Sequence, residues 1–398
     1  MRLLIILLLT SFTFGEQYFP GDVWETKTIE ESGLTQDKVD TLFDLTFNDE
    51  ATMGAILIKD GYIVKEQYAE GFNQNSHGTS WSTAKSFYAA LIGISLDRGE
   101  IESLDDPVSK YISEYDNPEK KDITIRQILN MTSGLDFPRH EHEMMFFEDD
   151  HMKYALEVGV DSVPGEKFEY NNVNSMLIGE ILKRATGKSA KTLIEERIFS
   201  KINVRNYTAW EDSVGNTLTY CCLDMSARDY SKFGLLFSRD GNWNGDQIIS
   251  EEYVAESLKL YWGSTPSMGW QHSDTRGYSL QWWISKHDDQ AKIFNTSGKF
   301  GQFIFIDKER DIIFTRITKY SPSGGEVQNF GPLRFLKFLG SVDAAVGFSR
   351  FLYNIGLIDF KKGSVQTPYT LKEGESKEFY ENYVEIVETM ATLEANEN

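Results

Sequence analysis

The feature that most constrains this chain is a helix predicted from Ser82-Thr83-Ala84-Lys85 up to Gly99, a natural stop. Its apolar side chains predict that it is buried. Ser82 and Lys85 are three residues apart, so both side chains project from one face of the helix. A serine hydroxyl needs a base to become a nucleophile, and lysine can serve only where its pKa is lowered. The pattern therefore predicts a nucleophile and its base at the start of a buried helix.

Strand patterns open and close the chain, and helical patterns fill its middle. A helix is expected over 35–48 and a hairpin over 54–64, with Asp60-Gly61 at its turn. Further helices are expected over 124–134, 174–187, 192–202, 225–241 and 251–258, and strands over 278–284, 293–294, 303–306 and 312–316. We therefore expect an α/β fold of the α+β type, with an antiparallel sheet flanked by helices and a mostly helical lobe over about 101–260.

The two ends of the chain differ from this body. Residues 1–15 combine Arg2, an apolar run and the small-x-small sequence Thr13-Phe14-Gly15, which predicts a signal peptide and an exported protein, periplasmic or secreted. The main domain is expected over 16–344 and a helical appendage over 345–398. Within the appendage an apolar face is expected to dock on the body rather than on a membrane surface; its members are Phe348, Phe351, Leu352 and Ile355. No segment is long and apolar enough to predict a membrane span.

Charge and cysteine content restrict the partners and the covalent chemistry. The formal net charge of −21 argues against nucleic acid and against anionic membrane surfaces. Cys221 and Cys222 are the only cysteines, and adjacent cysteines are poorly placed to bridge each other. We expect them to be small core residues, with no disulfide holding the fold.

Residues 138–165 mix histidines, acids and aromatics with little periodicity. A zinc site involving His140, His142 and His151 is one interpretation, but the spacing fits no strong metal pattern. A lid over a pocket is the favoured interpretation, because long irregular segments in compact domains are usually functional or disordered and the paired aromatics indicate order. We therefore predict no metal and no cofactor.

Three motifs occur in a diagnostic order: Ser82-x-x-Lys85, then Tyr170-Asn171-Asn172, then Ser297-Gly298-Lys299 just before a strand. This order resembles the serine β-lactamase-like superfamily. The stretches TIRQILNMTSGLDF, FEYNNVNSMLIGEIL and GKFGQFIFIDKERDIIF are similar to class C β-lactamase-related esterases and 6-aminohexanoate-dimer hydrolases. The resemblance covers about residues 30–340 and implies a β-lactamase/transpeptidase-like fold.

The resemblance also implies roles. Ser82 matches the nucleophile, Lys85 the group that receives its proton, and Tyr170 the group that carries a proton to the leaving group. Asn172 matches a residue that positions Lys85 or the substrate, although it could instead be only the N-cap of the next helix. The backbone N–H of Ser82 and the strand at 297–299 are the expected oxyanion donors.

The third motif departs from the family pattern, because its lysine comes last rather than first. Lys299 could contact a substrate carboxylate or lower the pKa of Tyr170, or be a solvated loop residue. This departure predicts weak or no β-lactamase activity. The expected function is a serine hydrolase acting on a small ester or amide; the alternative is a penicillin-binding or acylation-type sensor with little turnover. The oligomeric state stays open.

Overall fold

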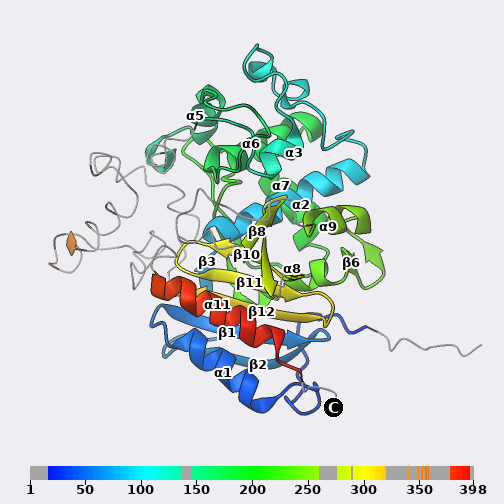
Figure 1. Ribbon diagram of the computed structural model, residues 1–398, viewed down its shortest axis with the longest axis vertical. Helices are drawn as coiled ribbons and strands as arrows, with labels where there is room; N and C mark the ends of the chain where they lie inside the picture. The colour runs from blue at the N-terminus through cyan, green and yellow to red at the C-terminus, as the bar shows by residue number, and fades with distance from the viewer. Residues whose placement is uncertain are drawn as a thin grey trace, which may run out of the picture.

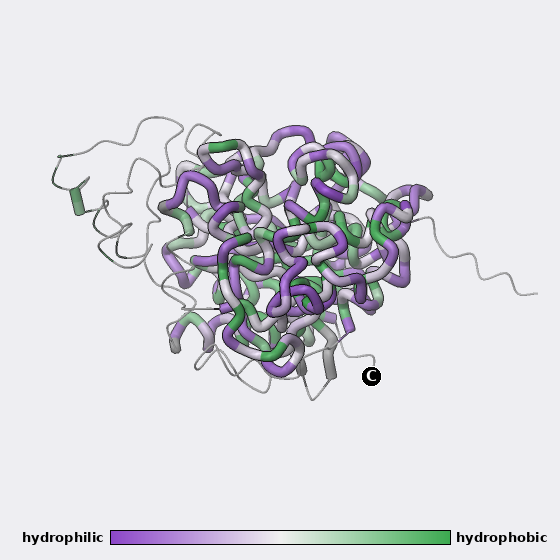
Figure 2. The backbone as a smooth tube through the Cα atoms, turned by 90° about the horizontal axis from the view of Figure 1, so that it is seen from above, coloured by the Kyte–Doolittle hydropathy of each residue, from purple (hydrophilic) through white to green (hydrophobic). Residues whose placement is uncertain are grey.

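The computed structural model describes residues 17–136, 145–259, 276–287, 290–319 and 377–394, with isolated positions between 339 and 357. The predicted signal peptide and the first part of the predicted lid lie outside the described residues. Figure 2 shows hydrophilic segments on many outer loops of the molecule, with hydrophobic segments between them. Among the helices that the structure describes, none has the length and apolar character needed to cross a membrane.

A seven-stranded antiparallel sheet forms the centre, with strand order β2-β1-β12-β11-β10-β9-β8. Its members are β1 (Thr52–Lys59), β2 (Tyr62–Tyr68), β8 (Arg276–Ser279), β9 (Trp282–His287), β10 (Gln290–Gly298), β11 (Gln302–Asp307) and β12 (Ile312–Thr318). Because β1 pairs with β12, strands from both ends of the chain meet in one sheet, as predicted. Asp60 (φ 53°) and Gly61 (φ 84°) form the predicted turn between β1 and β2.

One face of this sheet is covered by the first and last helices, α1 (Gln36–Phe47) and α11 (Lys377–Ala391), which lie side by side in blue and red (Figure 1). Their apolar faces pack against the sheet in a cluster that includes Val39, Leu42, Phe43, Phe305, Phe314, Ile386 and Met390. The docked part of the predicted appendage is therefore α11. The docking prediction for its earlier apolar face is wrong, because Phe348, Phe351 and Ile355 are exposed.

The other face carries α2 (Ala84–Asp97) and α8 (Ala227–Ser238), which share a core with the inward-facing isoleucines of β1, β11 and β12. Gly234 permits the close approach of α8, because a Cβ there would lie 2.8 Å from Ile304 Cγ2. Beyond α2 lies the helical lobe, with α3 (Ile125–Leu129), α5 (His151–Glu157), α6 (Asn172–Thr186), α7 (Ala190–Ile194) and α9 (Glu251–Ser257) (Figure 1). The fold class predicted from the sequence is confirmed.

Short elements connect these layers. The strands β3 (His77–Thr79), β4 (Thr208–Ala209) and β5 (Leu223–Ser226) form a small sheet, and β6 (Asn242–Trp243) pairs with β7 (Asp246–Gln247). The single turns of helix are η1 (Trp81–Thr83), η2 (Val108–Lys110), η3 (Ser113–Tyr115), η4 (Met145–Phe147) and η5 (Glu195–Phe199). Since β3 leads directly into η1, this small sheet sets where α2 begins.

Two predicted elements are wrong, and one contact explains both. The helix expected over 124–134 ends at Leu129, and the strand expected over 278–284 is the β8–β9 hairpin. Its turn residues Leu280 (φ 37°) and Gln281 (φ 70°) are not the glycine or asparagine that usually mark such a turn. Their N–H groups instead donate to Asn130 Oδ1 (2.8 Å) and to the Leu129 carbonyl (3.1 Å). These two hydrogen bonds pair the turn with the C-terminal end of α3, so they stabilise the turn and the end of the helix at the same time.

Candidate active site

The predicted nucleophile lies in η1, the turn between β3 and α2. Trp81 precedes it with φ 47°, a left-handed conformation that is uncommon for a bulky side chain. The Trp81 ring packs edge-on against Phe146 of η4 (6.0 Å between centroids) and Phe300 (5.5 Å). The surrounding structure therefore holds the residue before Ser82 in a strained conformation, as is common at functional sites.

Lys85 is buried within α2 and contacts three acceptors. Its Nζ donates to Ser82 Oγ (2.8 Å), to Asn172 Oδ1 (2.9 Å) and to the Tyr220 carbonyl (2.6 Å). All three acceptors are uncharged, so these contacts bring no opposite charge to compensate the lost hydration of the ammonium group. Burial accordingly lowers the pKa of Lys85 well below its ordinary value. Once deprotonated, Lys85 keeps two N–H groups for Asn172 and the Tyr220 carbonyl, and its lone pair faces Ser82 Oγ and can accept the serine proton.

The second motif lies at the start of α6, and its two asparagines have different contacts. Asn171 is the N-cap, since its side chain accepts from the N–H of Val173 (2.8 Å). The alternative that Asn172 is the cap is therefore wrong, and its side chain contacts Lys85 instead. The Tyr170 ring lies 5.1 Å from Lys85 Nζ and stacks on Trp283 of β9 (5.6 Å between centroids).

The third motif ends β10 and packs against the nucleophile turn. A Cβ on Gly298 would lie 2.1 Å from the Ser80 carbonyl, so only glycine permits this approach. Thr83 Oγ1 donates to the Gln302 carbonyl (3.1 Å), which ties η1 to β11 as well. Ser297 and Lys299 are half-buried here, and Lys299 Nζ lies 5.7 Å from the centroid of the Phe300 ring. The structure thus brings Ser82, Lys85, Tyr170 and Asn172 together where α2 and α6 meet, and the end of β10 reaches the same turn through Gly298.

Sequence reasoning missed the segment that supplies the third acceptor of Lys85. Tyr220 contributes a backbone carbonyl, which no side-chain pattern reveals. The next two residues, Cys221 and Cys222, form a disulfide, so the prediction that they do not bridge is wrong. The prediction assumed ordinary backbone, whereas Cys222 has φ 102° and the two Cα atoms lie 3.5 Å apart. The adjacent cysteines themselves were the available signal.

His151, from the predicted lid, lies behind the same segment. Its Nε2 faces the Glu148 carbonyl (3.1 Å) and its Nδ1 the Tyr220 hydroxyl (3.0 Å). Since a carbonyl only accepts, Nε2 carries the proton and Nδ1 accepts from Tyr220. Burial lowers the pKa of His151 to about 4. His140 and His142 lie outside the described residues, and within those that are described no cluster of His, Cys, Asp and Glu could hold a metal.

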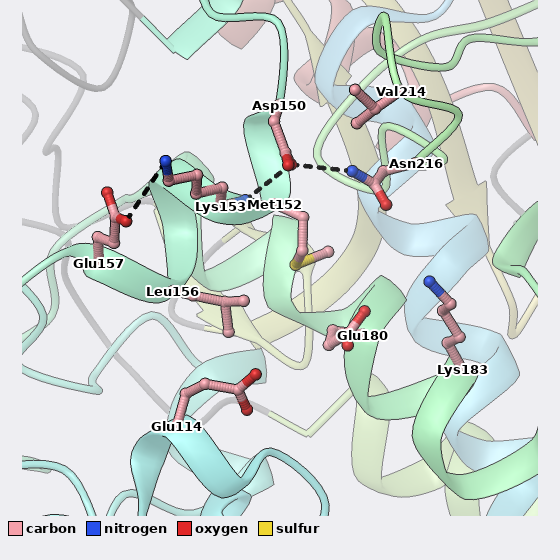
Figure 3. A pocket seen from close by; sticks show the side chains of 10 residues that line it. All are labelled: Glu114, Asp150, Met152, Lys153, Leu156, Glu157, Glu180, Lys183, Val214 and Asn216. Atoms are coloured by element: carbon pink, nitrogen blue, oxygen red, sulfur yellow. Dashed lines mark hydrogen bonds and ion pairs between the residues drawn. The ribbon is translucent and has the colours of Figure 1, made fainter.

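A surface pocket of about 430 Å³ lies elsewhere, between α5 and α6 (Figure 3). Four carboxylates and two lysines contribute to its wall, and Asp150 bonds to Asn216 within it (3.1 Å). None of the predicted site residues lines this pocket. It is therefore separate from the Ser82 centre.

The antiparallel sheet and the helical lobe beside it define a β-lactamase/transpeptidase-like fold. Residues 46–334 match the family model described as Beta-lactamase, and the chain belongs to this family. The family resemblance identified from the three motifs is thereby confirmed.

Solved structures share the fold at low sequence identity. A protein of Bacillus anthracis assigned as a 6-aminohexanoate-dimer hydrolase is 22% identical with a TM-score of 0.63, covering 82% of this chain and 88% of that one. A family VIII carboxylesterase is 20% identical with a TM-score of 0.59, covering 71% and 90%. An uncharacterized protein of Alkalihalophilus pseudofirmus is 23% identical over 225 residues, which is 49% of this chain and 61% of that relative. This chain thus spans less than two thirds of that curated relative.

Proposed function

We propose that this protein is an exported serine hydrolase that cleaves a small ester or amide through an acyl-enzyme on Ser82. The observation that carries the proposal is the 2.8 Å contact between Lys85 Nζ and Ser82 Oγ at a position where burial lowers the lysine pKa. A neutral lysine within hydrogen-bond reach of a serine hydroxyl meets the geometric requirement for general-base catalysis.

In the first half of the reaction, Lys85 takes the proton of Ser82 as Oγ bonds to the substrate carbonyl carbon. The negative charge on the carbonyl oxygen is stabilised by the N–H of Ser82 and by backbone at the end of β10, near Ser297 and Gly298. Tyr170 passes a proton to the leaving alcohol or amine as its bond to carbon breaks. Lys85 returns its proton to Tyr170 to complete the transfer.

In the second half, water replaces the leaving group. Tyr170 or Lys85 takes a proton from the water, whose oxygen bonds to the acyl carbon, and Ser82 leaves with a proton. Asn172 positions Lys85 throughout through its 2.9 Å contact. Lys299, half-buried beside this centre, is the residue proposed to meet a carboxylate on the substrate.

The substrate class is argued from the wall around Tyr170. This wall is a buried cluster of Met131, Phe168, Tyr278 and Trp283. Because this buried cluster packs behind the half-buried Tyr170 ring, we propose that the part of the substrate next to that ring is apolar. The similarity to structures assigned as a carboxylesterase and a 6-aminohexanoate-dimer hydrolase supports ester or amide hydrolysis. We propose weak or no β-lactamase activity, since the third motif lacks a leading lysine.

The decisive experiment is intact mass after incubation with a fluorophosphonate, together with release of p-nitrophenol from short-chain esters. We expect one adduct per chain and steady turnover in the wild type, and neither with Ser82→Ala. The exposed Ser113 supplies the matched control, because Ser113→Ala should label and turn over normally. Labelling that persists in Ser82→Ala would reject Ser82 as the nucleophile. A burst of one product equivalent without turnover would favour the sensor alternative.

The role of Tyr170 is tested with Tyr170→Phe, which removes the hydroxyl but keeps the ring stacked on Trp283. We expect turnover to fall by about 10²–10³ with the fold intact, because a general acid–base group contributes in this range. Unchanged kcat would mean that another group carries the proton. Export is tested separately by N-terminal sequencing of protein recovered from outside the cytoplasm, where cleavage after Gly15 is expected.

A further inference from the structure

The disulfide between the two adjacent cysteines lies between two contacts to the nucleophile turn. Before it, the Tyr220 carbonyl accepts from Lys85 Nζ (2.6 Å). After it, the Leu223 N–H donates to Ser80 Oγ (2.7 Å), and the Leu223 carbonyl accepts from the Ser80 N–H (2.7 Å). The two bridged residues therefore set the distance and direction between these two contacts.

The flanks of the disulfide are held independently of it. The Tyr220 hydroxyl bonds to His151, and the Leu223 carbonyl also accepts from the Tyr230 hydroxyl (2.6 Å). The Cys222 carbonyl accepts from the Trp210 N–H (3.1 Å). The Cys221 N–H, which shares a peptide plane with the Tyr220 carbonyl, donates to the Leu218 carbonyl (3.1 Å). The peptide between the two cysteines is therefore the part left for the disulfide to fix, and its conformation affects where the Tyr220 carbonyl points.

This backbone has a conformation that the cysteines would not readily adopt alone. Cys222 has φ 102°, which side chains with a Cβ disfavour and glycine tolerates. Both cysteines are buried, at 2% and 0% exposure, so contacts with solvent do not stabilise this backbone conformation. The covalent bond joins the two side chains directly and restricts the rotation of the peptide between them.

We propose that the Cys221–Cys222 disulfide is a positioning element for Lys85, and that the oxidised protein is the more active form. The inference rests on the proposed Ser82–Lys85 chemistry. Reduction by a dithiol breaks the S–S bond, each cysteine sulfur gains a proton, and the dithiol is oxidised to its own cyclic disulfide. The reduced segment then relaxes toward negative φ at Cys222 and turns the Tyr220 carbonyl away from Lys85.

The first test measures the oxidation state and the activity of the same sample. Alkylation under denaturing conditions should add no groups to the protein as purified and two after dithiol treatment. Over the same treatment, kcat/KM for a short-chain ester should fall by about 10–100-fold, since small misplacements of a catalytic group have effects of this size. Reoxidation should restore it. Two free thiols in the fully active protein would overturn the proposal.

A pair of variants separates backbone positioning from loss of the sulfurs. Both lack the disulfide: Cys221→Ala with Cys222→Ala, and Cys221→Ala with Cys222→Gly. Glycine can take φ 102° without a Cβ penalty, so the glycine variant should retain about fivefold more activity than the alanine variant. Neither should respond to dithiol. Equal activities, with no effect of reduction on the wild type, would overturn the proposal.

The last test asks whether the disulfide acts through Lys85. In Lys85→Ala, the residual fluorophosphonate reaction should be the same before and after reduction, because the group being positioned is absent. If reduction instead loosened the whole fold, it would lower the fluorophosphonate reaction of Lys85→Ala as well as that of the wild type. A wild type that labels at Ser82 and turns over ester but ignores reduction would reject this inference alone. Labelling that survives Ser82→Ala would reject the proposed function instead.

Discussion

Two regions of this molecule bury a cation almost completely, and they treat it in opposite ways. Lys85 between the sheet and the helical lobe and Arg316 in β12 are each 1% exposed. Arg316 donates to the Asp49 carboxylate (2.7 Å), whereas the three acceptors that Lys85 contacts are neutral. Burial lowers the pKa of both, but the charge of Asp49 opposes this for Arg316 only.

The difference shows how one fold separates structure from chemistry. An arginine stays protonated under all usable conditions, so pairing it with a carboxylate makes a fixed structural contact. A lysine that is desolvated without a counter-charge can lose its proton and become a base. Burial alone is therefore not diagnostic, and the charge of the partner decides which cation is reactive.

The largest effect is expected when Lys85, the reactive cation, is replaced. Lys85→Ala should lower kcat/KM by about 10²–10⁴, the usual contribution of a general base. Lys85→Arg should fail to rescue, because guanidinium remains protonated. In the wild type, kcat/KM should rise with pH through a pKa well below that of ordinary lysine, since only neutral Lys85 accepts a proton. Near-wild-type rates with Lys85→Arg would show that Lys85 is not the base.

The next largest effect is expected when the ion pair between Arg316 and Asp49 is broken. Asp49→Asn should lower the free energy of unfolding by about 3 kcal/mol, because it leaves Arg316 charged and buried without its counter-charge. The kcat of the folded fraction should not change. Urea unfolding followed by circular dichroism measures the loss, and Asp44→Asn, at an exposed site on the preceding helix α1, is the control. Equal stability of the two variants would contradict the contrast with Lys85.

A third buried group, the His151 imidazole, extends the comparison to protein stability at acidic pH. His151 has Asp212, Asp150 and Glu148 nearby, yet burial outweighs them and lowers its pKa to about 4. As pH falls, His151 therefore binds a proton at a higher pH in the unfolded chain than in the folded one. Stability is lost as pH falls from about 6.5 toward 4. Between pH 7.5 and 5, this group should cost about 2 kcal/mol. His151→Gln should show a correspondingly smaller loss by urea unfolding at the two pH values; identical losses would contradict the burial effect.

The smallest effect concerns the cost of keeping the reactive cation. Lys85→Met should lower turnover as much as Lys85→Ala does, yet raise the free energy of unfolding by about 1 kcal/mol, since it removes a desolvated polar group from an apolar helix. Thermal unfolding of wild type and variant at pH 7 measures the change. A large loss of stability would mean that Lys85 is held for structure, as Arg316 is.

The sequence alone predicted the parts of this protein whose determinants are local. The helix at Ser82–Lys85, the Asp60-Gly61 hairpin and the α6 helix before Gly187 follow from spacing and from glycine at positive φ, which neighbouring residues set. The motif order also identified the family, because three motifs in sequence are specific together. The motifs also named Lys85 as the base, Ser82 as the group that gives it a proton and Asn172 as a candidate to position it, but not its third partner.

Tertiary structure decided what depends on residues far apart in the chain. The β8–β9 turn forms because Leu280 and Gln281 bond to α3 rather than because of their own preferences. The Tyr220 carbonyl reaches Lys85 across 135 positions, and a backbone group carries no sequence signature. The Cys221–Cys222 bond likewise joins residues whose flanks are anchored to distant elements and whose backbone departs from ordinary φ, so residue types at adjacent positions could not predict it.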